Sequence, residues 1–213
     1  MSTKITTPEL VEQIKEDFDA VYDAGYEKGK AEGGGDNYYD TFWDNYQDNG
    51  EKTDYRYTFA GYGWSNKTFK PKYSLSNIKF TNVIGMFQYS NITKVDYDLD
   101  FSRATGTAAN YAFTNSLTKT IKLITLPKAD NTTVFSSAKS LTSIRINGTT
   151  EYNFAFVDSP LDKASIESII ESLSDVTTGK TCALKKAAVN AAFTTEEWEA
   201  LTKTKENWTF TLK

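Results

Sequence analysis

The sequence predicts an α+β repeat protein: a short β-solenoid with an N-terminal helix before it and a mixed α/β cap after it. A cassette recurs between residues 55 and 166, in which an aromatic residue is followed by an apolar residue and then by alternating Ile, Leu and Val. A period in the twenties is typical of solenoids, whose units bury their apolar faces against one another. Outside the cassettes, apolar residues follow helical spacing. Aligned on their aromatic residue, the cassettes place Phe59, Phe87, Phe113, Phe135 and Phe156 at steps of 28, 26, 22 and 21 residues.

Composition indicates an ordered globular chain and excludes several kinds of site. Of the 213 residues, 39% are hydrophobic and 24% charged, and the net charge is −4. An acidic balance argues against nucleic-acid binding, which needs a basic surface. The chain has one cysteine and no histidine, so Ser-His-Asp triads, Cys-His triads, the usual zinc sites and an intrachain disulfide are excluded. We expect no metal and no cofactor.

Residues 8–33 are predicted to form a helix, with Thr7 as N-cap and Pro8 at the first helical position. Its apolar stripe continues in glycine, which costs about 1 kcal/mol relative to alanine inside a helix. Either the helix frays into a flexible linker, or the glycines allow close packing in a self-associating bundle, most simply a trimer. We treat 1–35 as an oligomerisation and anchoring segment. Its stripe consists of Leu10, Ile14, Phe18, Val21, Gly25 and Gly29.

Residues 36–54 are predicted to form an aromatic cap, built on a short helix over 36–48 that Asn49 and Gly50 end. A solenoid needs an element that covers the open core of its first repeat. The same aromatic stripe could instead stack on sugar rings. Its members are Tyr39, Phe42, Trp43 and Tyr46.

The repeats occupy 55–159. We expect the Phe of each cassette to point inward and to stack on its equivalent in the next turn, while Ser, Thr and Asn form the corners. The strands should carry alternating apolar residues, which are Ile92, Val95 and Tyr97, then Ile121, Leu123 and Ile124, then Leu141, Ile144 and Ile146.

Residues 160–213 are predicted to form a C-terminal cap of mixed α and β structure. A helix should begin at Ser159 and Pro160, with apolar residues of 161–173 on one face. The segment 181–193 is expected to be a strand with a short excursion. A second helix should follow Thr195, and residues 209–212 should form the last strand.

The aromatic residues near the first repeat form a candidate ligand-binding group. Ring faces beside polar side chains can bind carbohydrate by stacking and hydrogen bonding. Packing of the first turn explains the same aromatics equally well. The group consists of Tyr55, Tyr57, Tyr62, Trp64 and Asn66.

Two other groups of residues invite a chemical interpretation. Asp96, Asp98 and Asp100 would share one face of a strand and could hold Ca²⁺, but Phe101 and Thr107 stand where an EF-hand loop needs Gly and Glu. We therefore expect a solvated acidic edge. Cys182 lies in an apolar run and is expected to be a small buried residue.

The cassettes resemble the BspA-type bacterial leucine-rich repeats, which carry an Ala-Phe pair, a Leu and an Ile-x-Ile strand. Tyr111–Phe113 and Phe154–Phe156 contain the Ala-Phe pair, and Leu141–Ile146 carries the Leu and Ile element. The whole chain also resembles a group of proteins from phages and prophages of gut Firmicutes. The strings shared with that group lie at Gly25–Gly34, Phe42–Gln47, Tyr57–Tyr73 and Lys205–Trp208.

The resemblance implies a non-enzymatic, virion-associated protein that displays a leucine-rich-repeat binding face, as in a tail fibre or another host-attachment protein. Its expected partners are further copies of the chain, other virion proteins and a host-surface glycan or protein. A capsid decoration protein, a bacterial surface adhesin and a carbohydrate-active enzyme are the alternatives. We expect no nucleic-acid partner, signal peptide or membrane span, and assembly in the host cytoplasm.

Overall fold

The computed structural model describes residues 53–61, 67–70 and 80–213. The chain divides into two compact units, Met1–Asn45 and Tyr46–Lys213, and every described residue belongs to the second. The described part is a mixed α/β structure with parallel sheets and three helices, which confirms the broad class predicted. The apolar and glycine stripe of residues 10–29 and the aromatic cap helix lie outside the described residues.

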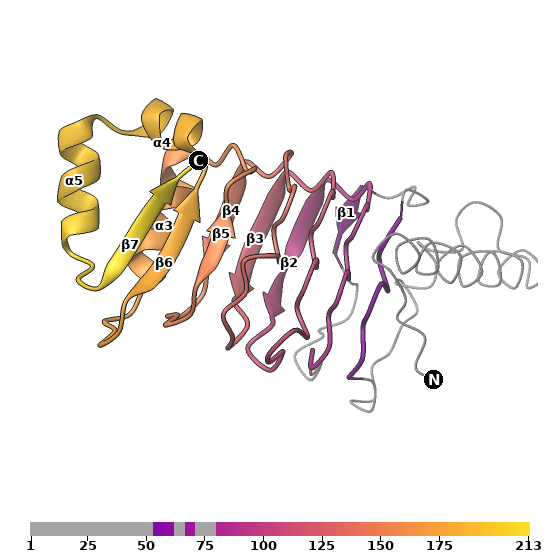
Figure 1. Cartoon of the computed structure of the whole chain (residues 1–213). Coiled ribbons are helices and arrows are strands. Elements are labelled where there is room, and N and C mark those ends of the chain that lie inside the picture. Colours follow the sequence, from indigo (N-terminus) through magenta and orange to yellow (C-terminus); the bar gives the residue numbers. More distant parts are fainter. Residues whose placement is uncertain (1–52, 62–66, 71–79) are drawn as a thin grey trace, which may run out of the picture. The chain divides into compact units, whose positions relative to one another are not determined.

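The strands form two parallel sheets (Figure 1). The first has the order β1-β2-β3-β4, and the second has the order β5-β6-β7. Because the order in each sheet follows the chain, every strand pairs with its sequence neighbours within its own sheet. The strands of the first sheet are β1 (Thr68–Phe69), β2 (Lys94–Asp100), β3 (Thr120–Thr125) and β4 (Ser143–Ile146). Those of the second are β5 (Phe154–Phe156), β6 (Lys180–Leu184) and β7 (Trp208–Leu212).

Five phenylalanine rings form a continuous stack through the core, one from each cassette. Neighbouring ring centroids lie 5.1, 4.9, 5.4 and 4.5 Å apart, with interplanar angles between 12° and 23°. Each ring is at most 1% exposed. Stacked pairs at this distance contribute about 0.5–1.5 kcal/mol beyond the burial of their area. The expected inward stacking is therefore confirmed, with the predicted register. The stack consists of Phe59, Phe87, Phe113, Phe135 and Phe156.

The turn segments around these rings are joined by backbone hydrogen bonds in parallel. The amides of Tyr57 and Phe59 donate to the carbonyls of Ile84 and Met86 in the next turn, at 3.0 and 2.9 Å. The same pattern runs one level on, where the Phe87 amide donates to a carbonyl of the third turn at 2.7 Å. Each turn is thus fixed to its neighbour by backbone bonds as well as by its ring.

The strands bury apolar residues against the stack, but their alternation is interrupted. The register between β2 and β3 shifts between Val95 and Asp98, which marks a bulge. After the bulge Leu99 points into the core, and Tyr97, expected there, is only half-buried. An equivalent shift follows Ile121 in the pairing of β3 with β4. For the same reason Leu123 is half-buried, contrary to a strict alternation. Ile146 is also half-buried, although its register partner Ile124 is buried.

Helix α3 (Lys163–Ser172) covers the last strand of the first sheet. The amide of Ile144 donates to Ser165 Oγ at 2.9 Å, and that of Ile146 donates to Ser168 Oγ at 3.0 Å. Two serine hydroxyls thus accept the bonds that a further strand would otherwise accept. The helix begins after Asp162, whose side chain accepts from the Ser165 amide, slightly later than Ser159 and Pro160 suggested.

The rest of the C-terminal region differs from the prediction in one element. Residues 181–193 were expected to be a strand with an excursion, but β6 ends at Leu184 and α4 (Lys186–Ala192) follows. Four of the seven residues of α4 are alanine, the best helix former. Helix α5 (Thr195–Lys203) begins with a capping box between Thr194 and Glu197, one residue before the cap expected.

The single cysteine behaves as a core residue. Cys182 is fully buried, and burial raises the pKa of its thiol to about 12. Its register partner in β5 is Phe154. At neutral pH the thiol stays protonated, so it serves as a small apolar side chain, as expected. None of the described helices is long and apolar enough to cross a membrane.

Replacing Phe113 with Ala should lower the free energy of unfolding by about 3–5 kcal/mol, because it removes a ring from the middle of the stack and leaves a cavity. A urea or guanidinium melt monitored by circular dichroism measures this. Leu117→Ala is the control, because Leu117 is 43% exposed and its loss should cost under about 0.5 kcal/mol. Equal losses for the two variants would contradict the stacked core.

Candidate binding surface

Three tyrosines stand out on the surface of consecutive turns. Tyr57, Tyr89 and Tyr111 are 37%, 45% and 44% exposed, while the Phe two residues away from each is buried. Tyr57 and Tyr111 precede their Phe by two positions, and Tyr89 follows its Phe by two positions. Their turns are hydrogen-bonded neighbours, since the amide of Tyr57 donates to Ile84 and that of Tyr89 donates to Thr114. We refer to these three exposed residues together as the tyrosine edge, although Tyr89 stands on the other side of its Phe from Tyr57 and Tyr111.

All three tyrosines adopt a left-handed backbone conformation. Their φ angles are 53°, 54° and 60°. Each occupies the third position of a tight turn, which is closed by a bond from the following amide to the carbonyl two residues before the tyrosine. For Tyr89 this bond runs from the Ser90 amide to the Phe87 carbonyl, at 3.1 Å. Two residues before the Phe, Gly85 is the equivalent of Tyr57 and Tyr111. Two residues after the Phe, Gly61, Asn115 and Ser137 are the equivalents of Tyr89.

This conformation is unfavourable for tyrosine. A positive φ brings Cβ close to the backbone, at a cost of roughly 1–2 kcal/mol, and Gly or Asn is the usual choice at the third position of such a turn. Residues in this region persist only where the surrounding structure fixes them, and they gather at functional sites. Here the buried Phe stack fixes the backbone, and the aromatic side chains are presented at its surface.

The ring of Tyr57 lies over the next turn. A Cβ placed at Gly85 would overlap this ring and come within 2.9 Å of Gln88 Oε1. Gly85 is the equivalent of Tyr57 in the following turn, with a φ of 57°. Glycine is therefore required there twice, for its conformation and for the room that the Tyr57 ring occupies. The ring of Tyr57 and the carboxamide of Gln88 therefore both lie beside Gly85.

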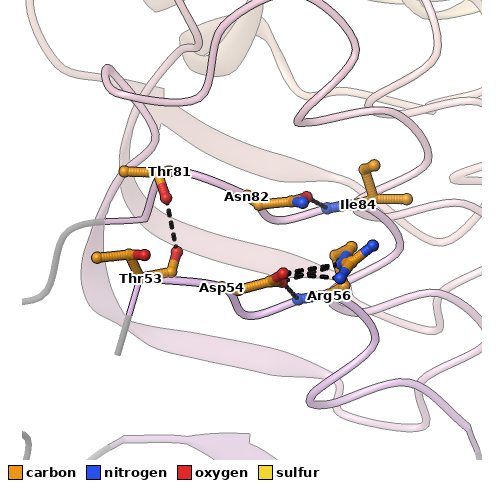
Figure 2. Close-up of polar contacts among 6 residues, drawn as sticks. All are labelled: Thr53, Asp54, Arg56, Thr81, Asn82 and Ile84. Carbon is orange, nitrogen blue, oxygen red and sulfur yellow. Dashed lines mark hydrogen bonds and ion pairs between the residues drawn. The ribbon is translucent and has the colours of Figure 1, made fainter. Parts of the chain in front are cut away.

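Side chains of Asp and Asn start these turns. Asp54 and Asn82 are paired in a parallel bridge, and the carboxamide or carboxylate oxygen of each accepts from the amide two residues later (Figure 2). The guanidinium of Arg56 also binds the Asp54 carboxylate, with its Nε 2.9 Å from Oδ2. Such Asx turns set the chain direction before the left-handed residue. The charge of Arg56 is balanced locally by its neighbour.

The hydroxyl of Thr81 donates to the Thr53 carbonyl of the preceding turn at 3.0 Å (Figure 2). Thr93 and Thr142 do the same to the carbonyls of Lys67 and Lys119. Threonine hydroxyls thus join successive turns at two corners, one before the Phe turn and one before the strand, which agrees with the polar corners expected. They hold the first turns in the register that places the tyrosines.

The sheet surface differs sharply in charge from the tyrosine edge. On β2, Asp96 lies 3.5 and 3.4 Å from the ammonium groups of Lys70 and Lys94, and Asp98 lies 2.8 Å from Lys122. Burial raises the pKa of Asp96, but the attraction of Lys94 and Lys70 outweighs it and holds that pKa below its usual value. The exposed surface of β2 therefore carries mutually paired charges.

The three aspartates of β2 each have a different partner. Asp100 Oδ1 accepts from the Ser102 amide at 2.9 Å, while Asp96 and Asp98 are paired with lysines. In the described ranges, no group of three or more His, Cys, Asp or Glu side chains could hold a metal ion. The aspartates form the solvated, ion-paired edge expected of them.

The turn segments that carry Tyr89 and Tyr111 are uncharged, whereas that of Tyr57 contains the paired Asp54 and Arg56. Residues 82–92, 108–117 and 131–138 contain no Asp, Glu, Lys or Arg. Their polar groups are hydroxyls and carboxamides, such as that of Asn131, which donates to Asn110 Oδ1 at 3.0 Å. This surface can stack on a flat partner and exchange neutral hydrogen bonds, and it offers no ionic attraction.

The predicted ligand group divides between core and surface. Tyr55 is fully buried and packs edge-on against Phe80, with ring centroids 4.9 Å apart, so its ring serves the core. Tyr57 is exposed, as a binding role requires. Tyr62, Trp64 and Asn66 lie outside the described residues.

Sequence reasoning missed Tyr89 and Tyr111. The available signal was an aromatic residue placed two positions before or after the Phe of a cassette, which Tyr57, Tyr89 and Tyr111 share. It becomes meaningful only once the Phe is known to point inward.

No protein-family model, curated protein or solved structure matches this chain.

Replacing Tyr111 with Asn should leave the free energy of unfolding unchanged or raise it by up to about 1 kcal/mol, because Asn adopts a positive φ more readily. Asn115, the other left-handed residue of the same turn, lies two residues after Phe113 and shows that Asn fits such a conformation. Tyr111→Val is the matched variant and should lower stability by about 1–3 kcal/mol, since a β-branched residue is strained there. Denaturant melts compare the three proteins. A large loss for Tyr111→Asn would mean that the ring supports the fold.

Proposed function

We propose that this chain is a non-enzymatic structural protein of a phage particle, which displays a leucine-rich-repeat-like solenoid for attachment to a host surface. The observation that carries the proposal is the combination of a rigid stack of turns with three exposed tyrosines in strained backbone. A rigid scaffold whose turns carry exposed aromatics is the usual design of a binding surface.

The solenoid interpretation rests on the repetition of one unit. Register partners Lys94, Thr120 and Ser143 begin successive strands, with steps of 26 and 23 residues, and the Phe rings advance in parallel with them. Each unit buries its ring only between its neighbours, which is how repeat proteins are stabilised. The Ala-Phe and Leu-x-x-Ile elements fit the BspA-type pattern, while the variable step departs from a strict repeat.

The anchoring part of the proposal rests on sequence. The apolar face of Leu10, Ile14, Phe18 and Val21 needs a partner, and a trimer would bury it together with Gly25 and Gly29. A free end bearing the solenoid suits a tail fibre. A capsid decoration protein would use the same anchor and display, and an adhesin would use the same display on a cell, so these two remain the alternatives.

Mass spectrometry of gradient-purified particles tests the proposal directly. Particles induced from a lysogen that carries this gene should contain the chain at a fixed ratio to the major capsid protein, and antibodies against it should label one part of the particle in electron micrographs. Label on the tail supports attachment, and label on the head supports decoration. Absence from particles, with the chain present in the lysate, would overturn the virion assignment.

The solution mass of the full chain should equal three chains, because the apolar and glycine stripe is proposed to form a trimer. Multi-angle light scattering measures it. Ile14→Asp combined with Phe18→Asp should reduce the mass to one chain, since buried carboxylates are costly, and a version that starts at Asp36 should also be a monomer.

The matched control for this measurement is Gln13→Asp combined with Ala20→Asp. It adds the same two carboxylates to the predicted helix but places them outside the stripe, so the mass should stay at three chains. A monomeric wild-type chain, or a control that dissociates as fully as the stripe variant, would contradict the anchor.

A further inference from the structure

We propose that Asn147 is a site of spontaneous deamidation, at which the backbone nitrogen of Gly148 attacks the side-chain carboxamide. The evidence is a combination of three features in the loop that follows β4. They are an Asn-Gly pair, exposure of both residues, and a Gly148 amide that donates no hydrogen bond to any other described residue. The modification does not depend on whether the chain belongs to a particle.

The reaction is an internal acyl transfer. The Gly148 nitrogen loses its proton and bonds to Cγ of Asn147, while the bond from Cγ to Nδ2 breaks and ammonia leaves. Water then opens the five-membered succinimide ring at either of its carbonyls, which gives aspartate or isoaspartate. The nucleophile and the carbonyl belong to neighbouring residues, so they react as an intramolecular pair and need no further reagent than water.

Glycine after the asparagine favours this attack. It has no Cβ to crowd the nitrogen, and its backbone reaches conformations that other residues rarely adopt. Gly148 has a φ of 74°, and a Cβ built there would meet no heavy atom within 4 Å apart from its chain neighbours. Among the described asparagines, Asn147 alone precedes a glycine. The other Asn-Gly pair of the sequence, Asn49 and Gly50, lies outside the described residues.

Backbone hydrogen bonds hold the two ends of the loop and leave its middle open. The amide of Asn147 donates to the Ile124 carbonyl, and the amide of Thr150 donates to the Ser172 carbonyl, both at 2.8 Å. Neither of the two amides between these anchors, the first of which belongs to Gly148, donates to another described residue. The attacking nitrogen can therefore react without loss of a hydrogen bond within the fold.

The carboxamide of Asn147 is weakly held. In the described structure its Nδ2 donates to Thr125 Oγ1 at 2.9 Å, between exposed side chains, where water competes for the same groups. Asn131 shows the contrast, because its side-chain oxygen accepts from the amides of Thr133 and Val134 at 3.0 and 3.2 Å and the residue is buried. The Asn147 carboxamide is thus free to turn toward the following nitrogen.

The products change the loop in two ways. Both add one negative charge to a chain whose net charge is already −4. Isoaspartate also lengthens the backbone by one carbon between the anchored amides of Asn147 and Thr150. Since Thr150 forms a parallel bridge with Leu173, isoaspartate alters the link between the end of β4 and the next turn, and aspartate does not.

Incubation of the folded full-length chain in mildly alkaline buffer, followed by peptide mapping with mass spectrometry, tests the inference. The peptide that contains Asn147 should gain the mass of an exchange of NH2 for OH and should contain isoaspartate, which only the succinimide route forms. Its rate should lie within about tenfold of the rate in urea-unfolded chain, because an open loop reacts without global unfolding. Asn115 is the internal control. The amide that follows it donates to the Phe113 carbonyl at 3.2 Å, so it should react at least about tenfold more slowly.

Two variants test the roles of the two residues. Gly148→Ala should slow the reaction at Asn147 by about tenfold or more, since a methyl group then crowds the attacking nitrogen. Alanine is strained at a positive φ, so a denaturant melt verifies that this variant folds. Asn147→Gln keeps a carboxamide but requires a larger ring, so it should abolish the reaction at this position even if Gly148→Ala is unstable.

Four results would overturn the inference. They are a folded chain that stays unmodified at Asn147, formation of aspartate without isoaspartate, equal rates at Asn147 and Asn115, and an undiminished rate in a folded Gly148→Ala variant or in Asn147→Gln. Peptide mapping assigns each change to one residue, so a reaction at Asn49 is not counted.

Discussion

The stack of five phenylalanine rings is the constraint on which the rest of the structure depends. The number of residues between rings varies from 21 to 28, yet the ring centroids stay between 4.5 and 5.4 Å apart. Packing therefore fixes the repeat in space while its length in sequence is free. Additional residues are taken up elsewhere in each turn, for example in the bulge of β2 between Val95 and Asp98. Removal of one ring from the stack would create a cavity between its two neighbours and would weaken the packing of both adjacent turns.

The stack also determines what the surface can be. Once a ring is buried, the chain must turn tightly on both sides of it, and the residue two positions away takes a positive φ. The core does not specify the side chain at that position. Gly61, Tyr89, Asn115 and Ser137 occupy it in successive turns while the backbone between them keeps its parallel hydrogen bonds. Within about five residues of each turn, the Phe thus determines the core packing, and the residue with the positive φ determines the surface chemistry.

The sequence predicts this core well because a large apolar residue at a regular step has few other uses. It predicts the strands less well, since one additional residue at Val95 or Ile121 moves the following side chains to the other face. The helix α4 was missed because its apolar pattern is short and its alanines fit either structure. The tyrosine edge was recognised only at Tyr57, because the exposure of Tyr89 and Tyr111 depends on a backbone conformation that tyrosine does not signal. Tyr55 was ambiguous for the opposite reason, since a buried and a stacking tyrosine look alike in sequence.

The row of strands and the row of turns end in different ways. The strand row ends at β4, because Ser165 and Ser168 accept the amides of Ile144 and Ile146. The turn row does not end there, since the bridge from Asn131 to Phe154 continues it into β5, β6 and β7. The later turns therefore connect to the C-terminal region. Thr133 stands two residues before Phe135, the position that Tyr57 and Tyr111 hold in their own turns. Among the described residues, aromatic side chains stand at left-handed positions only in the earlier turns, at Tyr57, Tyr89 and Tyr111.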